Sequence, residues 1–289
     1  MINLNCKISC LVSFVPSLIF ELMNPEQLNL EFNQIRSQLK SFIVRITASI
    51  ADTEDIVQDT YLKALEKLNT FKGESSLKTW LFSIASNLAK DNLRAKKRWA
   101  ENASDIFREE ALADRVFFQE AIHIRNTSTH GAFEIKEHIS FCFTCVSKTL
   151  PLEQQICLLL KEVYEFKTSE IALIIGNTEA MVKYYLRAGR GKMMDVFDHR
   201  CSLINKEGVC HQCTELNGIF NPAQKVQEEL VKIEMTREAG NLEKEQLFDL
   251  RTKIVQELDP FESGAAELQL HHLEHNRKVM EKYSEKVSV

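Results

Sequence analysis

The chain has 289 residues, enough for one or two domains, and its content of 44% hydrophobic and 27% charged residues is ordinary for a soluble globular protein. Only 9 Gly and 5 Pro argue against a sandwich or barrel, which needs many turns. The net charge is −5, but residues 90–99 hold five bases and one acid, and residues 183–192 hold four bases and no acid. Two basic patches on an acidic chain indicate targeted contact with an anion.

The first 25 residues form an apolar leader with a single lysine. Pro16 interrupts this run, which is too short for the roughly 20 apolar residues that span a bilayer. It lacks the small-residue cleavage site of a signal peptide. We favour a translation start at Met23 and expect residues 1–25, where they are made, to be a dispensable and disordered leader. We therefore expect a cytoplasmic protein without membrane contact.

Three amphipathic segments predict a first compact helical unit. The first segment spans residues 26–50, and Asp52 is a candidate cap for the second. Gly73 breaks the second helix, and Ser75 or Ser76 begins the third. The second helix has an apolar stripe made of Val57, Tyr61, Ala64, Leu65 and Leu68.

Further along, a polar segment with weak periodicity predicts a partly helical linker, and a second helical unit follows. The chain ends in a cysteine-bearing loop and an acidic amphipathic tail, broken at Gly240 and at Asp259-Pro260. The predicted organisation is a first unit at residues 26–100, a linker at 101–134, a second unit at 135–197 and a tail at 198–289.

The second unit contains a predicted helix-turn-helix at residues 170–193. Gly176 suits the left-handed position that ends a helix, and Asn177 or Thr178 can cap the next one. The second helix fits a major groove, where Lys and Arg hold phosphates and first-turn residues reach base edges. Its outer face carries Glu179, Lys183, Arg187 and Arg190. Taken alone, the segment could equally be a helical hairpin with a solvated charged face.

Two longer motifs resemble the extracytoplasmic function sigma factors of bacterial RNA polymerase. The EDIVQDTYLKA helix, the FKGES loop, the KTWLFSIASN helix and the basic NLRAKKR end resemble region two of that family. The segment LPLEQQICLLLKEVYEFKTSEIALIIGNTEAMVKYYLRAGRGKM resembles region four, in the same order and at a comparable separation. The resemblance covers about residues 26–100 and 135–195. It implies an all-α fold of two small helical domains, joined by a linker and extended here by a helical tail.

The resemblance implies that the acidic face of the second helix docks on the clamp helices of the largest subunit of core polymerase, with the polymerase flap as a further contact. Without the resemblance, these surface groups would be interpreted as solvated. The candidate polymerase-binding residues are Glu54, Asp55, Gln58 and Asp59.

In the family, the third helix and the loop before it read the melted minus-ten element. Opening a base pair costs a few kcal/mol, so a flipped base needs a pocket and a stacking surface. Trp80 corresponds to an aromatic residue at the upstream edge of melting, and burial in the core is its alternative role. Leu81 replaces a second aromatic, which predicts a weaker melting wedge and a demand for a better promoter match. The candidate residues here are Lys72, Trp80, Asn87, Lys90, Arg94, Lys97 and Arg98.

For the helix-turn-helix, the resemblance implies binding to the minus-thirty-five element of promoter DNA. The candidates for base contact are Thr178, Glu179 and Ala180, and those for contact further along the helix are Lys183, Tyr184, Arg187 and Arg190. We find no glycine-rich phosphate loop, nucleophile triad or catalytic carboxylate pair in the sequence. We therefore expect a specificity subunit and not an enzyme.

The tail departs from the family pattern, since most members end soon after region four. Its Cys201, Cys210 and Cys213 are candidate ligands for Zn²⁺, although no cofactor is expected to be required. A second Cys-x-x-Cys pair, Cys142 and Cys145, could join them or simply fill the core. The histidines at 271, 272 and 275 are expected to be solvated. The tail itself is either regulatory, covering basic faces or binding a partner, or a plain appendage.

Three functions compete. The first is a sigma factor that binds core polymerase and promoter DNA, and an anti-sigma factor is a possible further partner. The second is a metal- or thiol-responsive helix-turn-helix regulator that acts without polymerase. The third is a regulatory protein that works only through protein contacts. An autonomous regulator has no need of the acidic EDIVQD face or the basic NLAKDNLRAKKR helix, so the first function is favoured.

Overall fold

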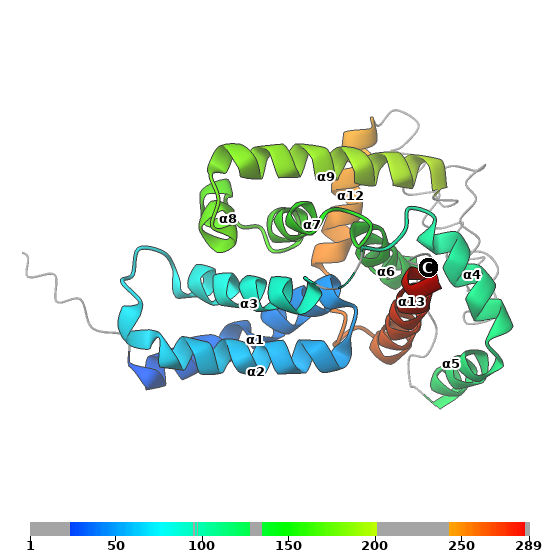
Figure 1. Cartoon of the computed structure of the whole chain (residues 1–289), viewed down its shortest axis with the longest axis horizontal. Coiled ribbons are helices and arrows are strands. Elements are labelled where there is room, and N and C mark those ends of the chain that lie inside the picture. Colours follow the sequence, from blue (N-terminus) through cyan, green and yellow to red (C-terminus); the bar gives the residue numbers. More distant parts are fainter. Residues whose placement is uncertain (1–23, 95, 97, 128–134, 201–242, 287–289) are drawn as a thin grey trace, which may run out of the picture.

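The computed structural model describes residues 24–94, 96, 98–127, 135–200 and 243–286 (Figure 1). All regular secondary structure in these residues is helical, which confirms the predicted all-α class. Figure 1 shows the first three helices as one layer, α7 to α9 as a second layer, and α4, α5 and α13 gathered at one end. None of the described helices is both long enough and apolar enough to cross a membrane.

The first two helices meet at a tight turn, which lies earlier in the chain than predicted. Helix α1 (Pro25–Thr47) ends at Ala48, whose φ of 57° is left-handed, so the predicted helix over residues 26–50 stops early. Helix α2 (Ile50–Glu66) is capped by Ser49 and not by Asp52. The Ser49 hydroxyl accepts a hydrogen bond from the Asp52 amide at 3.2 Å, so Asp52 lies in the first turn.

The loop after α2 agrees with the sequence prediction. A short 3-10 turn, η1 (Leu68–Thr70), follows α2, and Gly73 has a left-handed φ of 68°. Ser76 then caps α3 (Leu77–Leu93) by accepting a hydrogen bond from the Thr79 amide at 3.1 Å. The predicted start of the third helix is confirmed.

The second unit is built from five helical segments. Gly176 has a φ of 66° between α8 and α9, as its position at a helix end predicts. The Thr178 hydroxyl accepts a hydrogen bond from the Met181 amide at 3.3 Å, so Thr178 caps α9. The segments are α6 (Ile135–Ser147), α7 (Leu152–Leu158), the π-helical turn η2 (Leu159–Val163), α8 (Thr168–Ile175) and α9 (Glu179–Arg200).

The linker and the tail are packed parts of the molecule. The linker forms α4 (Ala103–Ala113) and α5 (Arg115–Thr127), and the tail forms α12 (Lys244–Gln256) and α13 (Ala266–Lys286). Helix α12 packs on α6, η2 and α9, while α13 packs on α4, α5 and α6. The described helices of the tail thus pack on the rest of the chain, and the break at Asp259-Pro260 is as predicted, whereas the predicted break at Gly240 lies outside the described residues.

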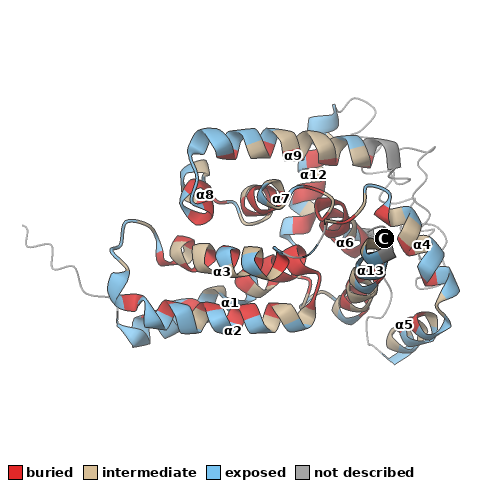
Figure 2. Ribbon diagram, viewed as in Figure 1, coloured by how far each residue is buried: buried red, intermediate tan, exposed pale blue. Residues whose placement is uncertain are grey.

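One hydrophobic core joins the two units (Figure 2). Phe82 of α3 is completely buried, and its ring lies 4.9 Å from that of Phe166 in the second unit. Phe248 of α12 belongs to the same core, and its ring lies 6.2 Å from that of Phe143 in α6. Burial of such large rings contributes about 1.5–3 kcal/mol each, so the units and the tail stabilise one another.

Candidate nucleic-acid and protein interfaces

Three of the four candidate polymerase-binding residues point into solvent from α2. Asp55, Gln58 and Asp59 are exposed, while Val57 on the same helix is buried in the core. Glu54 is the exception, because its carboxylate forms a 2.5 Å ion pair with Lys40 of α1. The free acidic face is therefore narrower than the sequence predicts.

An apolar groove of about 380 Å³ between α1 and α2 lies beside this acidic face. Phe32 and Tyr61 form its floor with ring centroids 5.0 Å apart, and Leu62 is 51% exposed at its edge. Gln58 lines the groove as well. This groove was not predicted from the sequence, and Leu65 of the predicted apolar stripe is 40% exposed. Leu62 was the available signal, since it is an apolar residue outside the buried stripe.

The loop before α3 and the first turns of α3 enclose a second pocket, of about 340 Å³. Trp80 lies at this pocket, partly buried, with its ring 5.0 Å from that of Phe71. The exposed Lys72 lines the same pocket. Leu173 of α8 also lines it, so the helix-turn-helix reaches the site where the sequence predicts capture of an unpaired base.

The cations of α3 divide into exposed and engaged groups. Arg94 is exposed, as is the polar Asn87. Lys90 instead donates a 3.4 Å hydrogen bond to the carbonyl oxygen of Ile175, at the C-terminal end of α8. Lys97 lies outside the described residues.

Arg98 lies at the corner between α6 and α7, where it binds the second unit. Its Nε donates to the Leu150 carbonyl at 2.6 Å, and its second amino group donates to the Ser147 carbonyl at 3.3 Å and to the Gln155 side chain. Burial lowers the pKa of Arg98 to about 10. In this arrangement Arg98 holds a helix end and is not available to DNA.

Helix α9 presents most of its predicted DNA-binding residues to solvent. The exposed residues are Thr178, Glu179, Ala180, Lys183, Tyr184 and Arg187. Arg190 differs, because its guanidinium forms hydrogen bonds of 2.7 and 2.6 Å to one carboxylate oxygen of Glu162 in η2. Burial raises the pKa of Glu162, and Arg190 opposes that shift. Arg190 thus anchors α9 to the core.

The candidate metal ligands are only partly within the described residues. Cys201, Cys210 and Cys213 lie outside them. Cys145 is buried in α6 and Cys142 is partly buried beside it, in agreement with their interpretation as core residues. Within the described part of the chain, no group of three or more His, Cys, Asp or Glu side chains is arranged to hold a metal ion.

The histidines of α13 pack against an aromatic ring, contrary to the prediction that they are solvated. His271 and His275 stack on Phe117 of α5, with ring centroids 4.9 and 3.8 Å away. His272 lies edge-on to the same ring at 5.1 Å. The periodicity of α13 could not reveal this, because the ring that they surround comes from a helix about 150 residues earlier.

Comparison with known protein families agrees with this architecture. Residues 32–99 match the family model for Sigma-70 region 2, and residues 140–193 match the model for Sigma-70, region 4. Both matched regions are parts of sigma-70 factors, and they occur here in one chain. Several relatives of the chain are named ECF RNA polymerase sigma factors.

The chain is similar to several proteins that are named as sigma factors. It is 28% identical over 170 residues to the ECF RNA polymerase sigma factor SigG of Mycobacterium tuberculosis, covering 56% of this chain and 46% of the relative. It is 29% identical over 154 residues to a probable RNA polymerase sigma factor of Haemophilus influenzae, covering 50% and 75%. The chain thus spans about half the length of the first relative.

Among solved structures, the chain is similar to the sigma factor RpoE from Bartonella quintana, crystallised with the anti-sigma factor NepR. That match has a TM-score of 0.41 and 19% identity, and it covers 59% of this chain and 96% of the other.

Proposed function

We propose that this chain is a sigma factor that binds core RNA polymerase and directs it to promoters with two recognition elements. The observation that carries the proposal is the pairing of two surfaces on one body. An acidic and apolar face lies on α2 of the sigma-70 region 2, and an exposed basic face lies on α9 of region 4. A helix-turn-helix regulator acting alone would have no use for the first surface.

The polymerase contact is proposed to combine charge with apolar burial. Asp55, Gln58 and Asp59 would meet basic groups of the clamp helices, and the neighbouring groove beside Leu62 would take an apolar side chain. Interfaces of this kind derive affinity from a desolvated apolar centre and orientation from the charged rim.

The minus-ten contact is proposed to centre on the pocket beside Trp80. An unpaired base would stack against Trp80 or Phe71, and Lys72 would hold a neighbouring phosphate. Base stacking on an aromatic ring contributes about 1–3 kcal/mol. Because Leu173 of α8 lines the same pocket, α8 and an unpaired base would compete for this space. Base capture would therefore accompany a separation of α8 from α3.

The minus-thirty-five contact is proposed to use the exposed face of α9. Lys183 and Arg187 would bind phosphates, with Tyr184 beside them, and Thr178 to Ala180 would meet base edges at the start of the helix. Arg190 would contribute by holding the orientation of α9 through its ion pair with Glu162.

The factor is proposed to act in the cytoplasm as a specificity subunit without catalytic chemistry of its own. An anti-sigma factor is a further candidate partner. Zinc binding by Cys201, Cys210 and Cys213 also stays a proposal, since Cys-x-x-Cys spacing suits tetrahedral Zn²⁺. Zinc content measured on protein purified under reducing conditions should fall when Cys210 and Cys213 are changed to Ser, and unchanged content would remove the proposal.

The test is transcription by core polymerase with and without the purified chain on fragments of the source genome. Sequenced 5′ ends that depend on the chain, preceded by two shared sequence elements, are the expected result. Tight binding to duplex DNA with no chain-dependent transcripts would favour the autonomous regulator instead.

A further inference from the structure

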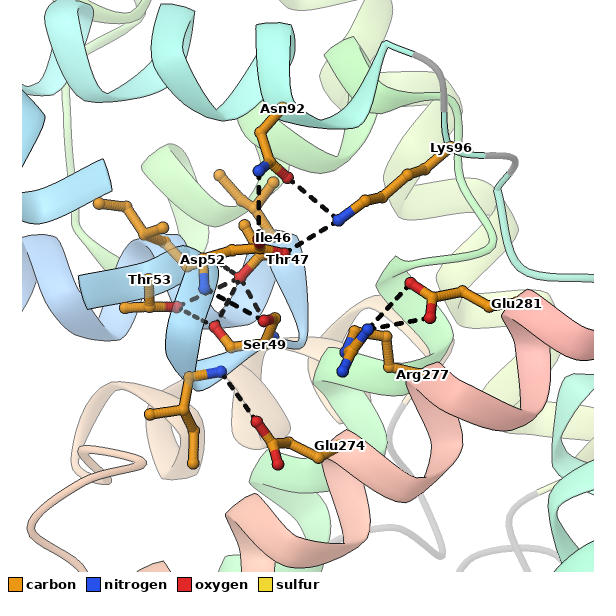
Figure 3. Close-up of polar contacts among 12 residues, drawn as sticks. Ile46, Thr47, Ser49, Asp52, Thr53, Asn92, Lys96, Glu274, Arg277 and Glu281 are labelled. Carbon is orange, nitrogen blue, oxygen red and sulfur yellow. Dashed lines mark hydrogen bonds and ion pairs between the residues drawn. The ribbon is translucent and has the colours of Figure 1, made fainter. Parts of the chain in front are cut away.

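A pocket of about 590 Å³ opens where the end of α3, the end of α6 and helix α13 meet. Lys96, Arg98, Lys148 and Arg277 line it as cations, and Glu281 and Glu285 as acids. Its size lies within the range of about 300–1,000 Å³ that is usual for small-molecule sites. No part of the proposed sigma function uses this pocket. Figure 3 shows Lys96 and the Arg277–Glu281 pair that face this region.

Positive charge is concentrated at the inner end of the pocket. Lys148 is 4% exposed, and its ammonium donates to the Ile46 and Thr47 carbonyls at 2.6 and 3.3 Å. Burial lowers the pKa of Lys148 far below its usual value, and the nearby Arg98 and Lys96 lower it further. An ammonium has three donors and these carbonyls use two, so one donor remains for a ligand.

The outer wall supplies a second unmet donor. One amino group of Arg277 donates to both carboxylate oxygens of Glu281, at 3.0 and 2.9 Å (Figure 3). The Nε atom of Arg277 is buried and has no hydrogen-bond partner among the described residues. A buried donor without an acceptor is costly, so a small shift of the Arg277 side chain that lets a ligand oxygen accept from Nε would stabilise the site.

The lining combines basic groups with an apolar side. Among the described residues, Lys96, Arg98 and Arg277 are offset by Glu281, Glu285 and Asp52, which lies just outside the pocket and pairs with Lys96 at 2.9 Å. Protonation of Lys148 therefore leaves one positive charge uncompensated. Leu93, Trp99 and Met280 form the apolar wall. A phosphate monoester carries a charge of about −1.5 to −2 at neutral pH, which would favour the protonated form of Lys148 in the complex.

We propose that this pocket binds a small organic phosphate, with the phosphate between Lys148 and Arg277 and the organic body against Leu93 and Met280. Such a ligand would touch region 2, region 4 and the tail together. Leu93 of α3, Lys148 directly after α6 and several residues of α13 line the pocket, so the bound ligand would stabilise the present arrangement of these helices. The ligand would thus be an effector, independent of whether the chain binds polymerase.

The test is isothermal titration calorimetry of the full chain with phenyl phosphate, which joins a phosphate to a flat apolar body. Saturable binding at one site is expected, and inorganic phosphate should bind more weakly because it leaves the apolar wall uncovered. Arg277→Gln should lower the affinity for phenyl phosphate at least about tenfold, because it removes a charged hydrogen bond. The matched control is Lys278→Gln, the neighbouring exposed cation on α13, which should leave the affinity unchanged.

Two further results distinguish specific binding in this pocket from non-specific electrostatic attraction of the anion to the protein. Glu281→Gln frees Arg277 and should tighten binding by up to about fivefold. Titration in buffers of different ionisation enthalpy should show proton uptake, because an anion raises the lowered pKa of Lys148. Absence of saturable binding, equal affinity for inorganic phosphate, or equal losses in the Arg277 and Lys278 variants would each overturn the proposal.

Discussion

The guanidinium of Arg45, in α1, donates a 2.8 Å hydrogen bond to the carbonyl oxygen of Leu258, in the segment between α12 and α13. The same side chain donates to Thr144 and Ser140 of α6 at 3.0 and 3.1 Å, and it is only 1% exposed. One buried cation therefore joins region 2, region 4 and the tail. Close by, Ser37 donates to Asp259 at 2.7 Å.

Replacing Arg45 by Met should destabilise the whole chain. The change removes the donor of the partly buried Leu258 carbonyl and of the buried Thr144 and Ser140 hydroxyls, which costs about 1–3 kcal/mol in the free energy of unfolding. Urea unfolding followed by circular dichroism measures this loss. Arg36→Met is the matched control, because Arg36 is exposed on the same helix and should shift stability by no more than about 0.5 kcal/mol. Equal stabilities for the two variants would show that the junction contributes nothing.

Acid should loosen the contacts of the tail with α5 and α6. Burial lowers the pKa of His138 in α6 to about 4 and that of His272 in α13 to about 3. In the unfolded chain each histidine titrates near 6.5, so below that pH the unfolded state binds more protons than the folded state. The free energy of unfolding should fall by up to about 1.4 kcal/mol per pH unit for each histidine between pH 6.5 and 4.

The measurement is denaturant unfolding at a series of pH values for the wild type and His138→Gln. The variant should show a shallower loss of stability below pH 6.5, since it lacks one of the histidines, among them His272 and His275, whose pKa burial lowers. His123→Gln, at an exposed position of α5, should follow the wild-type slope. If all three proteins lose stability in parallel, the buried histidines are not the cause.

Arg190→Met should lower the stability of the folded chain, because Arg190 forms an ion pair with Glu162. It leaves the carboxylate of Glu162, which is 7% exposed, without its cation, and about 1–3 kcal/mol of stability should be lost near neutral pH. The deficit should shrink as the pH falls, because a neutral Glu162 no longer needs Arg190. Adding Glu162→Gln to the variant should recover part of the loss. Full stability of Arg190→Met at neutral pH would contradict this role.

Lys183 and Arg187 should show the opposite behaviour. Both are exposed, so their change to Gln should leave stability intact. If each holds one phosphate, each change should lower the slope of log affinity against log salt concentration by about one for promoter binding by the assembled polymerase. Arg187→Lys should retain the slope because the charge is kept. Unaltered salt dependence in both Gln variants would exclude phosphate contact by this face.

Local signals in the sequence were sufficient for the helix-turn-helix. Gly176 has a left-handed backbone, and Thr178 caps the helix that follows it, as Ser76 does for α3 in the first unit. These features depend on neighbouring residues alone, and the periodicity of the helices supplied the buried faces. The predicted boundary between α1 and α2 is wrong because Ser49 and Asp52 are both residues that often cap helices. The left-handed backbone of Ala48 ends α1 early, and this makes Ser49 the cap of α2.

Tertiary contacts account for the rest of the errors. Arg98 and Arg190 look like nucleic-acid ligands in a basic segment, yet each binds groups more than 25 residues away in the sequence. The histidines of α13 were expected in solvent because their partner Phe117 lies far along the chain. The groove beside Leu62 depends on two helices facing each other. No periodicity within one segment encodes such pairings.

The most direct test of the proposed function is co-elution of the chain with core RNA polymerase on a sizing column. The double variant Asp55→Lys with Asp59→Lys reverses the exposed acidic face of α2. Its control, Glu245→Lys with Glu267→Lys, makes the same charge change at exposed positions of α12 and α13. The account predicts that the control co-elutes like the wild type and that the α2 variant does not. Undiminished co-elution of the α2 variant would contradict it.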